Sequence, residues 1–143
     1  MKVLVYTDGG SRGNPGPSAY GVVLANEDGK VLKQTARFLG EGTNNEAEYR
    51  GLIAGLSLAL EIGADEVEVV MDSQLVVHHV DGSYRLKAEH LRPLLEEART
   101  LMKRFRSAKV VFRGRENPMT SRADELVNQE LDAMAFARSL RKP

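Results

Sequence analysis

The chain has 143 residues, a length typical of one domain. Its 20 basic and 20 acidic residues cancel, it has no cysteine, and 42% of its residues are hydrophobic. This composition excludes a disulfide framework, a cysteine nucleophile, a disordered chain and a uniformly basic coat protein. No apolar run approaches the roughly 20 residues that span a bilayer, and the apolar start is too short for a signal peptide. We therefore expect one domain over residues 1–143, without a membrane partner and located in the cytoplasm.

The balanced charge hides a strong segregation along the chain. Residues 1–84 carry a net charge of −6, residues 85–115 a net charge of +7, and residues 116–143 a net charge of −1. Half of the basic residues therefore lie in one stretch of 31 residues. Such asymmetry favours a polyanionic partner.

The first third of the chain predicts three antiparallel strands. Residues 3–7 form a β-branched apolar run that ends at Asp8, and the glycine- and proline-rich segment 9–18 predicts a loop. Residues 20–25 and 31–38 predict the second and third strands. An Asp-Gly pair between these two strands is typical of a hairpin turn.

The rest of the chain alternates between helical and extended patterns. Apolar residues recur at helical spacing over residues 44–62, and Thr43 with Glu46 forms a capping-box signature. The further expected elements are a strand over 67–71, a helix over 73–80 capped by Ser73, a helix over 88–106, a strand over 109–113, a helix capped by Ser121 and a frayed tail over 138–143. This order predicts one α/β domain. Because crossovers are right-handed, strand 67–71 is expected parallel to strand 3–7.

Four carboxylates lie at positions that favour a shared catalytic or metal-binding site. Asp8 and Asp72 end two strands that are expected to be parallel neighbours, so both reach the same sheet edge. Glu48 lies near one predicted helix start, and Asp124 lies three residues after Ser121. Each acid alone is explained more readily by a helix dipole or a turn than by a site. Together they predict an oxygen-ligand site for Mg²⁺ or Mn²⁺, and two such ions can support phosphodiester cleavage.

Four motifs in chain order resemble those of the type 1 ribonuclease H family. They fall within residues 4–130 and are the segments 6–17, 43–49, 71–76, and 115–117 with 122–128. The resemblance implies an α/β, ribonuclease H-like fold, with a mixed five-stranded sheet of three antiparallel and two parallel strands flanked by helices. It also implies a monomer that hydrolyses the RNA strand of RNA/DNA hybrids with two Mg²⁺ or Mn²⁺ ions, leaving 5′-phosphate and 3′-hydroxyl ends.

The same resemblance assigns roles to individual residues. The catalytic, metal-binding acids that it implies are Asp8, Glu48, Asp72 and Asp124. The substrate-binding residues that it implies are Ser11, Asn14, Thr43, Asn44 and Gln74. This fits their chemistry, because short amides, hydroxyls and exposed backbone can hydrogen-bond 2′-hydroxyls. For Asn44, ordinary helix-start chemistry is the alternative explanation.

Two features of many family members are missing here. Residues 114–120 contain no histidine, so Arg115 or Glu116 is a candidate substitute, and no tryptophan-bearing basic protrusion precedes the fourth motif. Phosphate contacts are therefore expected from the +7 stretch, although a solvated helix face explains these residues equally well: Arg85, Lys87, Arg92, Arg99, Lys103, Arg104 and Arg106. Two other functions stay open, a hybrid- or duplex-binding module without catalysis and another two-metal nuclease. Duplex RNA and RNA–DNA junctions stay open as substrates.

Overall fold

The computed structural model describes residues 1–114 and 116–141, in which a mixed sheet is flanked by helices. The elements are β1 (Lys2–Ser11), β2 (Gly16–Ala25), β3 (Val31–Gly42), α1 (Asn44–Glu61), β4 (Glu66–Met71), α2 (Gln74–Asp81), the 3-10 turn η1 (Glu89–Leu91), α3 (Arg92–Met102), β5 (Ser107–Phe112) and α4 (Pro118–Ser139). The strand order is β3-β2-β1-β4-β5. β1, β2 and β3 are antiparallel neighbours, while β4 is parallel to both β1 and β5. The predicted fold class is confirmed.

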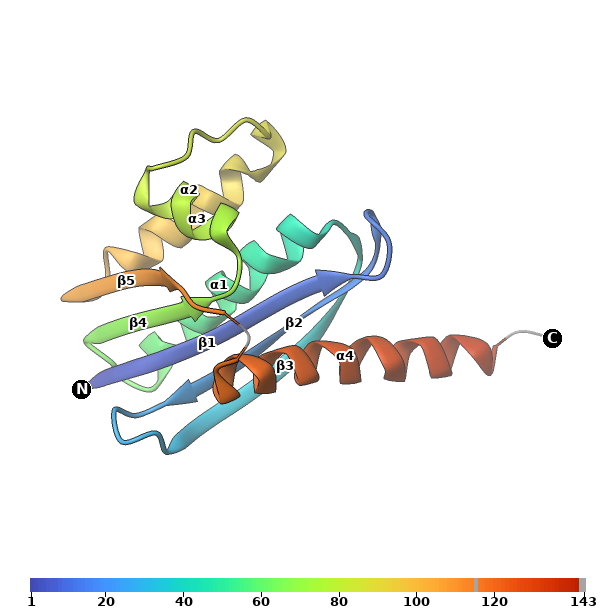
Figure 1. Ribbon diagram of the computed structural model, residues 1–143, viewed down its shortest axis with the longest axis horizontal. Helices are drawn as coiled ribbons and strands as arrows, with labels where there is room; N and C mark the ends of the chain where they lie inside the picture. The colour runs from blue at the N-terminus through green and yellow to red at the C-terminus, as the bar shows by residue number, and fades with distance from the viewer. Residues whose placement is uncertain (115, 142–143) are drawn as a thin grey trace.

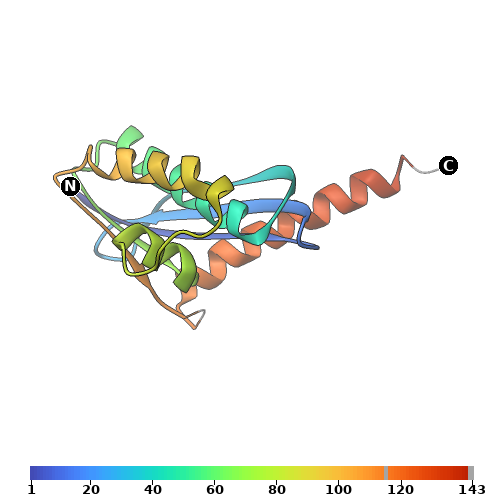
Figure 2. The ribbon, with the colours of Figure 1, turned by 90° about the horizontal axis from the view of Figure 1, so that it is seen from above.

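Helices cover the two faces of the sheet unequally. α1 packs on β1 and β2 with α3 behind it, and α4 crosses the opposite face over β1, β2 and β3 (Figures 1 and 2). The alternation of β1 matches these layers, because Val3 and Val5 join the α1 core whereas Tyr6 joins the α4 core. Within the described residues, no helix is long and apolar enough to cross a bilayer.

The first hairpin is longer than the sequence predicts. The expected loop over residues 9–18 is mostly strand, because Gly9 pairs with Tyr20 and Gly10 with Ala19. Glycine is required at position 9, where a Cβ would lie 2.3 Å from the carbonyl carbon of Ala47 in α1. Gly9 therefore allows the close approach of β1 and α1 rather than marking a loop.

The last helix begins earlier than predicted. Asn117, rather than Ser121, is its N-cap, since the Asn117 Oδ1 accepts hydrogen bonds from the N–H groups of Met119 (2.9 Å) and Thr120 (3.4 Å). Pro118 occupies the first turn, where proline is favoured. The helix continues to Ser139 and so includes the start of the expected tail, of which residues 142–143 lie outside the described part of the chain.

The basic stretch is divided between two ends of the domain. The predicted helix over 88–106 is shorter, because η1 precedes α3 and α3 ends at Met102. Arg106 forms ion pairs with Asp65 (3.8 Å) and Glu66 (3.4 Å), beside the start of β4. β4 has six residues, so this end of the sheet lies about 20 Å from the end that carries Asp72. Lys103, Arg104 and Arg106 therefore lie at the end of the sheet where β4 begins, opposite the end that carries Asp72.

Candidate active site

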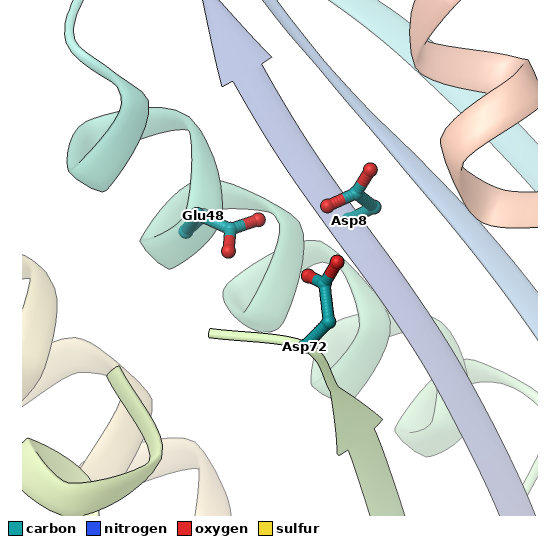
Figure 3. Close-up of side chains that lie close together, drawn as sticks. All are labelled: Asp8, Glu48 and Asp72. Atoms are coloured by element: carbon teal, nitrogen blue, oxygen red, sulfur yellow. The ribbon is translucent and has the colours of Figure 1, made fainter. Parts of the chain in front are cut away.

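Three carboxylates converge where β1 and β4 meet the N-terminal half of α1. Asp8 lies in β1, Asp72 directly follows β4, and Glu48 lies in the second turn of α1. One carboxylate oxygen from each lies within 4.8 Å of the others, and the three side chains point toward one another (Figure 3). Within the described residues, this is the one group of three or more acidic or histidine side chains that could hold a metal ion. The predicted meeting of Asp8 and Asp72 at one sheet edge is confirmed.

The close packing of β1 and α1 holds Glu48 against Asp8. The N–H of Gly9 donates a hydrogen bond of 2.5 Å to Oε1 of Glu48, across the contact that an alanine side chain would block. Asp8 and Glu48 are both buried, with only 2% and 8% of their residue surface exposed. The acids therefore occupy a largely dehydrated site, in which charge repulsion is poorly screened.

Burial changes the ionisation of Glu48. Its pKa is raised to about 7, first by burial and then by the negative charge of Asp72. Hydrogen bonds from the Gly9 N–H and from the side chains of Asp8 and Ser73 act in the opposite direction. The site therefore retains a proton near neutral pH unless a cation replaces it.

Asp124 lies outside the group of three but close to it in the fold. It is half-buried in the second turn of α4, where Asn128 donates to its Oδ2 (3.5 Å) and to its main-chain oxygen (3.2 Å). Gly21 pairs with Asp8 in the sheet, and a Cβ on Gly21 would lie 2.4 Å from the carbonyl oxygen of Ala123. α4 therefore crosses the sheet with Ala123 over Gly21, the residue that pairs with Asp8. Asp124 is the next residue in the helix.

Three of the predicted substrate-binding residues form a network beside the acids. Oδ1 of Asn44 accepts hydrogen bonds from the N–H (2.8 Å) and Oγ (3.2 Å) of Ser11. The N–H of Asn44 donates to Oδ1 of Asn14 at 3.0 Å. These contacts fix the β1–β2 hairpin to the first turn of α1. Asn14 and Asn44 are exposed, so polar side-chain atoms of both remain accessible to a ligand.

The other predicted positions differ in their surroundings. Thr43 is the N-cap of α1, as predicted, because its Oγ1 accepts a hydrogen bond from the Glu46 N–H. The Glu46 carboxylate returns to the Thr43 hydroxyl, which donates to Oε1 at 3.1 Å. Gln74 is exposed in the first turn of α2, after the Ser73 N-cap. Arg115 lies outside the described residues, and Glu116 is exposed.

A buried polar pair behind the acids was not predicted. Tyr49 is fully buried, and its hydroxyl lies 2.9 Å from Nδ1 of His79 in α2. Burial raises the pKa of Tyr49 to about 12 and lowers that of His79, with nearby Arg99 lowering both. The sequence shows both residues on helical segments, but their contact depends on how α1 packs against α2.

Comparison with known proteins agrees with this geometry. The family described as "Reverse transcriptase-like" matches residues 6–130. The bifunctional protein Rv2228c of Mycobacterium tuberculosis is 43% identical over 94% of this chain, which spans only 37% of that protein. Ribonuclease HI of Halobacterium salinarum is 40% identical over 92% of the chain, which spans 65% of it. This chain thus covers less than two thirds of these relatives.

Solved structures extend the comparison to three dimensions. The N-terminal RNase H domain of Rv2228c superposes with a TM-score of 0.91 and 42% identity, covering 96% of this chain and 99% of that one. RNase H1 of Halobacterium salinarum gives a TM-score of 0.89 and 39% identity, over 93% of this chain and 99% of that one. The chain belongs to the type 1 ribonuclease H family. Another ribonuclease H, LC11-RNase H1 in complex with an RNA/DNA hybrid, gives a TM-score of 0.86 and 39% identity, over 93% of this chain and 99% of that one.

Proposed function

We propose that the chain is an endoribonuclease that hydrolyses the RNA strand of RNA/DNA hybrids at Asp8, Glu48, Asp72 and Asp124. The observation that carries this proposal is the convergence of three carboxylates within 4.8 Å, from β1, from the N-terminal half of α1 and from the residue that follows β4. One related structure, LC11-RNase H1, is a complex with an RNA/DNA hybrid. We further propose that the chain acts as a monomer, and that it works in the cytoplasm, since the absence of cysteine fits a reducing compartment.

The acids fit two Mg²⁺ or Mn²⁺ ions. All donors in the group are carboxylate oxygens, which these hard cations prefer, and the group contains no histidine or cysteine. Two buried acids beside a third carry more negative charge than a dehydrated site tolerates without cations. Asp8, Glu48, Asp72 and Asp124 would hold the two ions, which would supply an activated water and charge stabilisation at the leaving 3′-oxygen. We propose that hydrolysis leaves 5′-phosphate and 3′-hydroxyl ends.

The chain's own residues would orient the strand that is cut. Ser11, Asn14 and Asn44 form a polar network on one side of the acids, and Gln74 is exposed on α2. Amide and hydroxyl groups of this kind can donate to and accept from a 2′-hydroxyl, which DNA lacks. The network is already hydrogen-bonded without substrate, so little ordering is needed when a strand binds.

The decisive experiment compares wild-type protein with Asp8→Asn in Mg²⁺ and in Mn²⁺. The change keeps the size of a buried side chain but removes its charge, so we expect folded protein with cleavage reduced at least about a hundredfold. Circular dichroism checks the fold, and calorimetric titration of Mg²⁺ and Mn²⁺ checks the loss of ion binding. Full activity of Asp8→Asn would overturn the assignment.

A substrate panel separates the proposal from its alternatives. We expect cleavage of labelled RNA/DNA hybrid and no cleavage of duplex DNA, with duplex RNA and a strand that contains one ribonucleotide tested alongside. Hybrid binding without cleavage in either metal would instead indicate a binding module. Cleavage of duplex DNA would indicate another two-metal nuclease.

A further inference from the structure

A buried polar contact joins three helices behind the acids. The hydroxyl of Tyr49 in α1 lies 2.9 Å from Nδ1 of His79 in α2, and the two residues are 0% and 5% exposed. Nη2 of Arg99 in α3 donates a hydrogen bond of 2.9 Å to the main-chain oxygen of His79. α2 contacts both α1 and α3 (Figure 1). His79 is therefore held through its side chain and through its backbone.

The contact between Tyr49 and His79 has a definite direction. The two rings are nearly parallel, at 9°, and their centroids lie 6.3 Å apart. Because the hydroxyl is 2.9 Å from Nδ1, this separation places the rings end to end, with the hydroxyl near the imidazole plane, where a ring nitrogen donates or accepts. Two apolar side chains of similar size would fill this space without burying a hydroxyl and an imidazole. A satisfied polar pair in a core instead favours one arrangement of the elements that carry it.

The same two helices also meet at the acids. Glu48 precedes Tyr49 in α1, and its carboxylate accepts a hydrogen bond from the side chain of Ser73. Ser73 is the N-cap of α2 and directly follows Asp72. α1 and α2 are therefore joined at two points, one at the N-cap of α2 and one at His79, six residues further along the chain.

α2 is too short to hold its own position. It has eight residues, Gln74–Asp81, and isolated helices of this length are unstable in water. Its orientation therefore depends on its tertiary contacts, of which the apolar ones have no direction. A hydrogen bond at the N-cap alone would let α2 pivot, and the pivot would move the Ser73 hydroxyl relative to Glu48. The contact of Tyr49 with His79 fixes the far end of the helix and opposes this motion.

We infer that Tyr49 and His79 are positioning residues, whose hydrogen bond orients α2 so that Asp72 and Ser73 face Glu48. The acids that it places are those proposed to hold the metal ions, so the inference rests on the metal site of the proposed function. Loss of a residue that orients metal ligands typically lowers metal affinity or activity roughly ten- to a hundredfold. Hybrid affinity should change little, because Tyr49 and His79 are both buried away from a duplex.

The test compares single and double variants of the pair. Tyr49→Phe removes only the hydroxyl, and we expect kcat on RNA/DNA hybrid and affinity for Mn²⁺ alone each to fall roughly tenfold, with KM changed by less than about twofold. His79→Asn keeps a polar group close to the position of Nδ1 and should retain most of both. Tyr49→Phe/His79→Leu replaces the polar pair by an apolar one. Its thermal unfolding should match that of the wild type, while its kcat and Mn²⁺ affinity stay as low as in Tyr49→Phe.

The matched controls are Tyr20→Phe, which removes a hydroxyl from a half-buried tyrosine, and His90→Asn, at an exposed histidine. Both should leave kcat, KM and Mn²⁺ affinity unchanged. Wild-type kcat and Mn²⁺ affinity in folded Tyr49→Phe/His79→Leu would overturn the inference. Losses that follow thermal stability from variant to variant would also overturn it, since the pair would then only hold the core together. If the wild type binds Mn²⁺ but does not cut the hybrid, the proposed function fails, while the Mn²⁺ titrations still decide the inference.

Discussion

Replacing Glu48 with glutamine removes a buried negative charge while keeping an oxygen for the Gly9 N–H. The pKa of Glu48 is raised from 4.5 to about 7 by burial and by Asp72. Between these two values the folded protein binds a proton that the unfolded chain does not, so the free energy of unfolding falls as pH rises. One pKa unit corresponds to about 1.4 kcal/mol, so ionised Glu48 destabilises the metal-free fold above pH 7 by up to about 3 kcal/mol.

Glutamine avoids this loss because it is neutral at every pH, and its amide can donate to Asp8, which already forms a side-chain hydrogen bond with Glu48. In EDTA at pH 8, we therefore expect Glu48→Gln to be more stable than the wild type by up to about 3 kcal/mol. The difference in free energy of unfolding between Glu48→Gln and the wild type should shrink as the pH falls through 7 and vanish near pH 4.5. Urea unfolding followed by circular dichroism at several pH values measures it. Added Mg²⁺ or Mn²⁺ should stabilise the wild type preferentially, since Glu48 then acts as a ligand.

The control for this experiment is Glu61→Gln, at the exposed end of the same helix. Its effect should stay within about 0.5 kcal/mol at every pH. If Glu48→Gln were less stable than the wild type at pH 8 in EDTA, or more stable by the same amount at pH 5 and pH 8, the reasoning about burial and Asp72 would be refuted.

Two further predictions concern the framework around the acids. Gly9→Ala should lower the free energy of unfolding by about 1–3 kcal/mol and reduce hybrid cleavage, because its Cβ would lie 2.3 Å from the Ala47 carbonyl carbon. Gly10→Ala is its control, since its nearest neighbours lie at 3.9 Å, and equal losses in the two variants would contradict the argument. Asn117→Ala should lower the free energy of unfolding by about 1 kcal/mol through loss of the α4 N-cap, and urea unfolding should detect this change. An unchanged stability would show that the cap contributes nothing.

The sequence predicts that the acids meet, because their meeting depends on only a few rules of strand pattern, crossover handedness and helix capping. Asp8 and Asp72 follow β-branched runs whose strands the crossover rule places side by side, although β1 continues past Asp8 to Ser11. Glu48 follows from a helix start at Thr43, which the capping box identifies. Local sequence patterns therefore suffice to place Asp8, Glu48 and Asp72 on their strands and helix. Packing of α1 on the sheet then brings the three carboxylates together.

Other features depend on tertiary contacts that local patterns do not show. The sequence predicts a loop at Gly9, because the contact of Gly9 with Ala47 links residues far apart in the chain and leaves no local pattern. Pro118 indicates a loop as readily as a helix start, so the sequence predicts Ser121 rather than Asn117 as the N-cap. The sequence offers phosphate contacts or a solvated helix face for most of the basic stretch. It does not show that Lys103, Arg104 and Arg106 lie at the end of the sheet opposite Asp72. The contact of Tyr49 with His79 likewise appears only in the packed structure.

The three converging acids have a consequence for folding. They come from β1, α1 and β4, whose contributing residues span positions 8 to 72 and meet only when the crossover helix docks on the sheet. No smaller supersecondary unit of the chain brings Asp8, Glu48 and Asp72 together. The three acids meet only after α1 has docked on the sheet. Divalent-ion binding during refolding should therefore appear in the same kinetic phase as α1 docking on β1. On the proposed function, binding of a divalent ion would report that the native topology has formed.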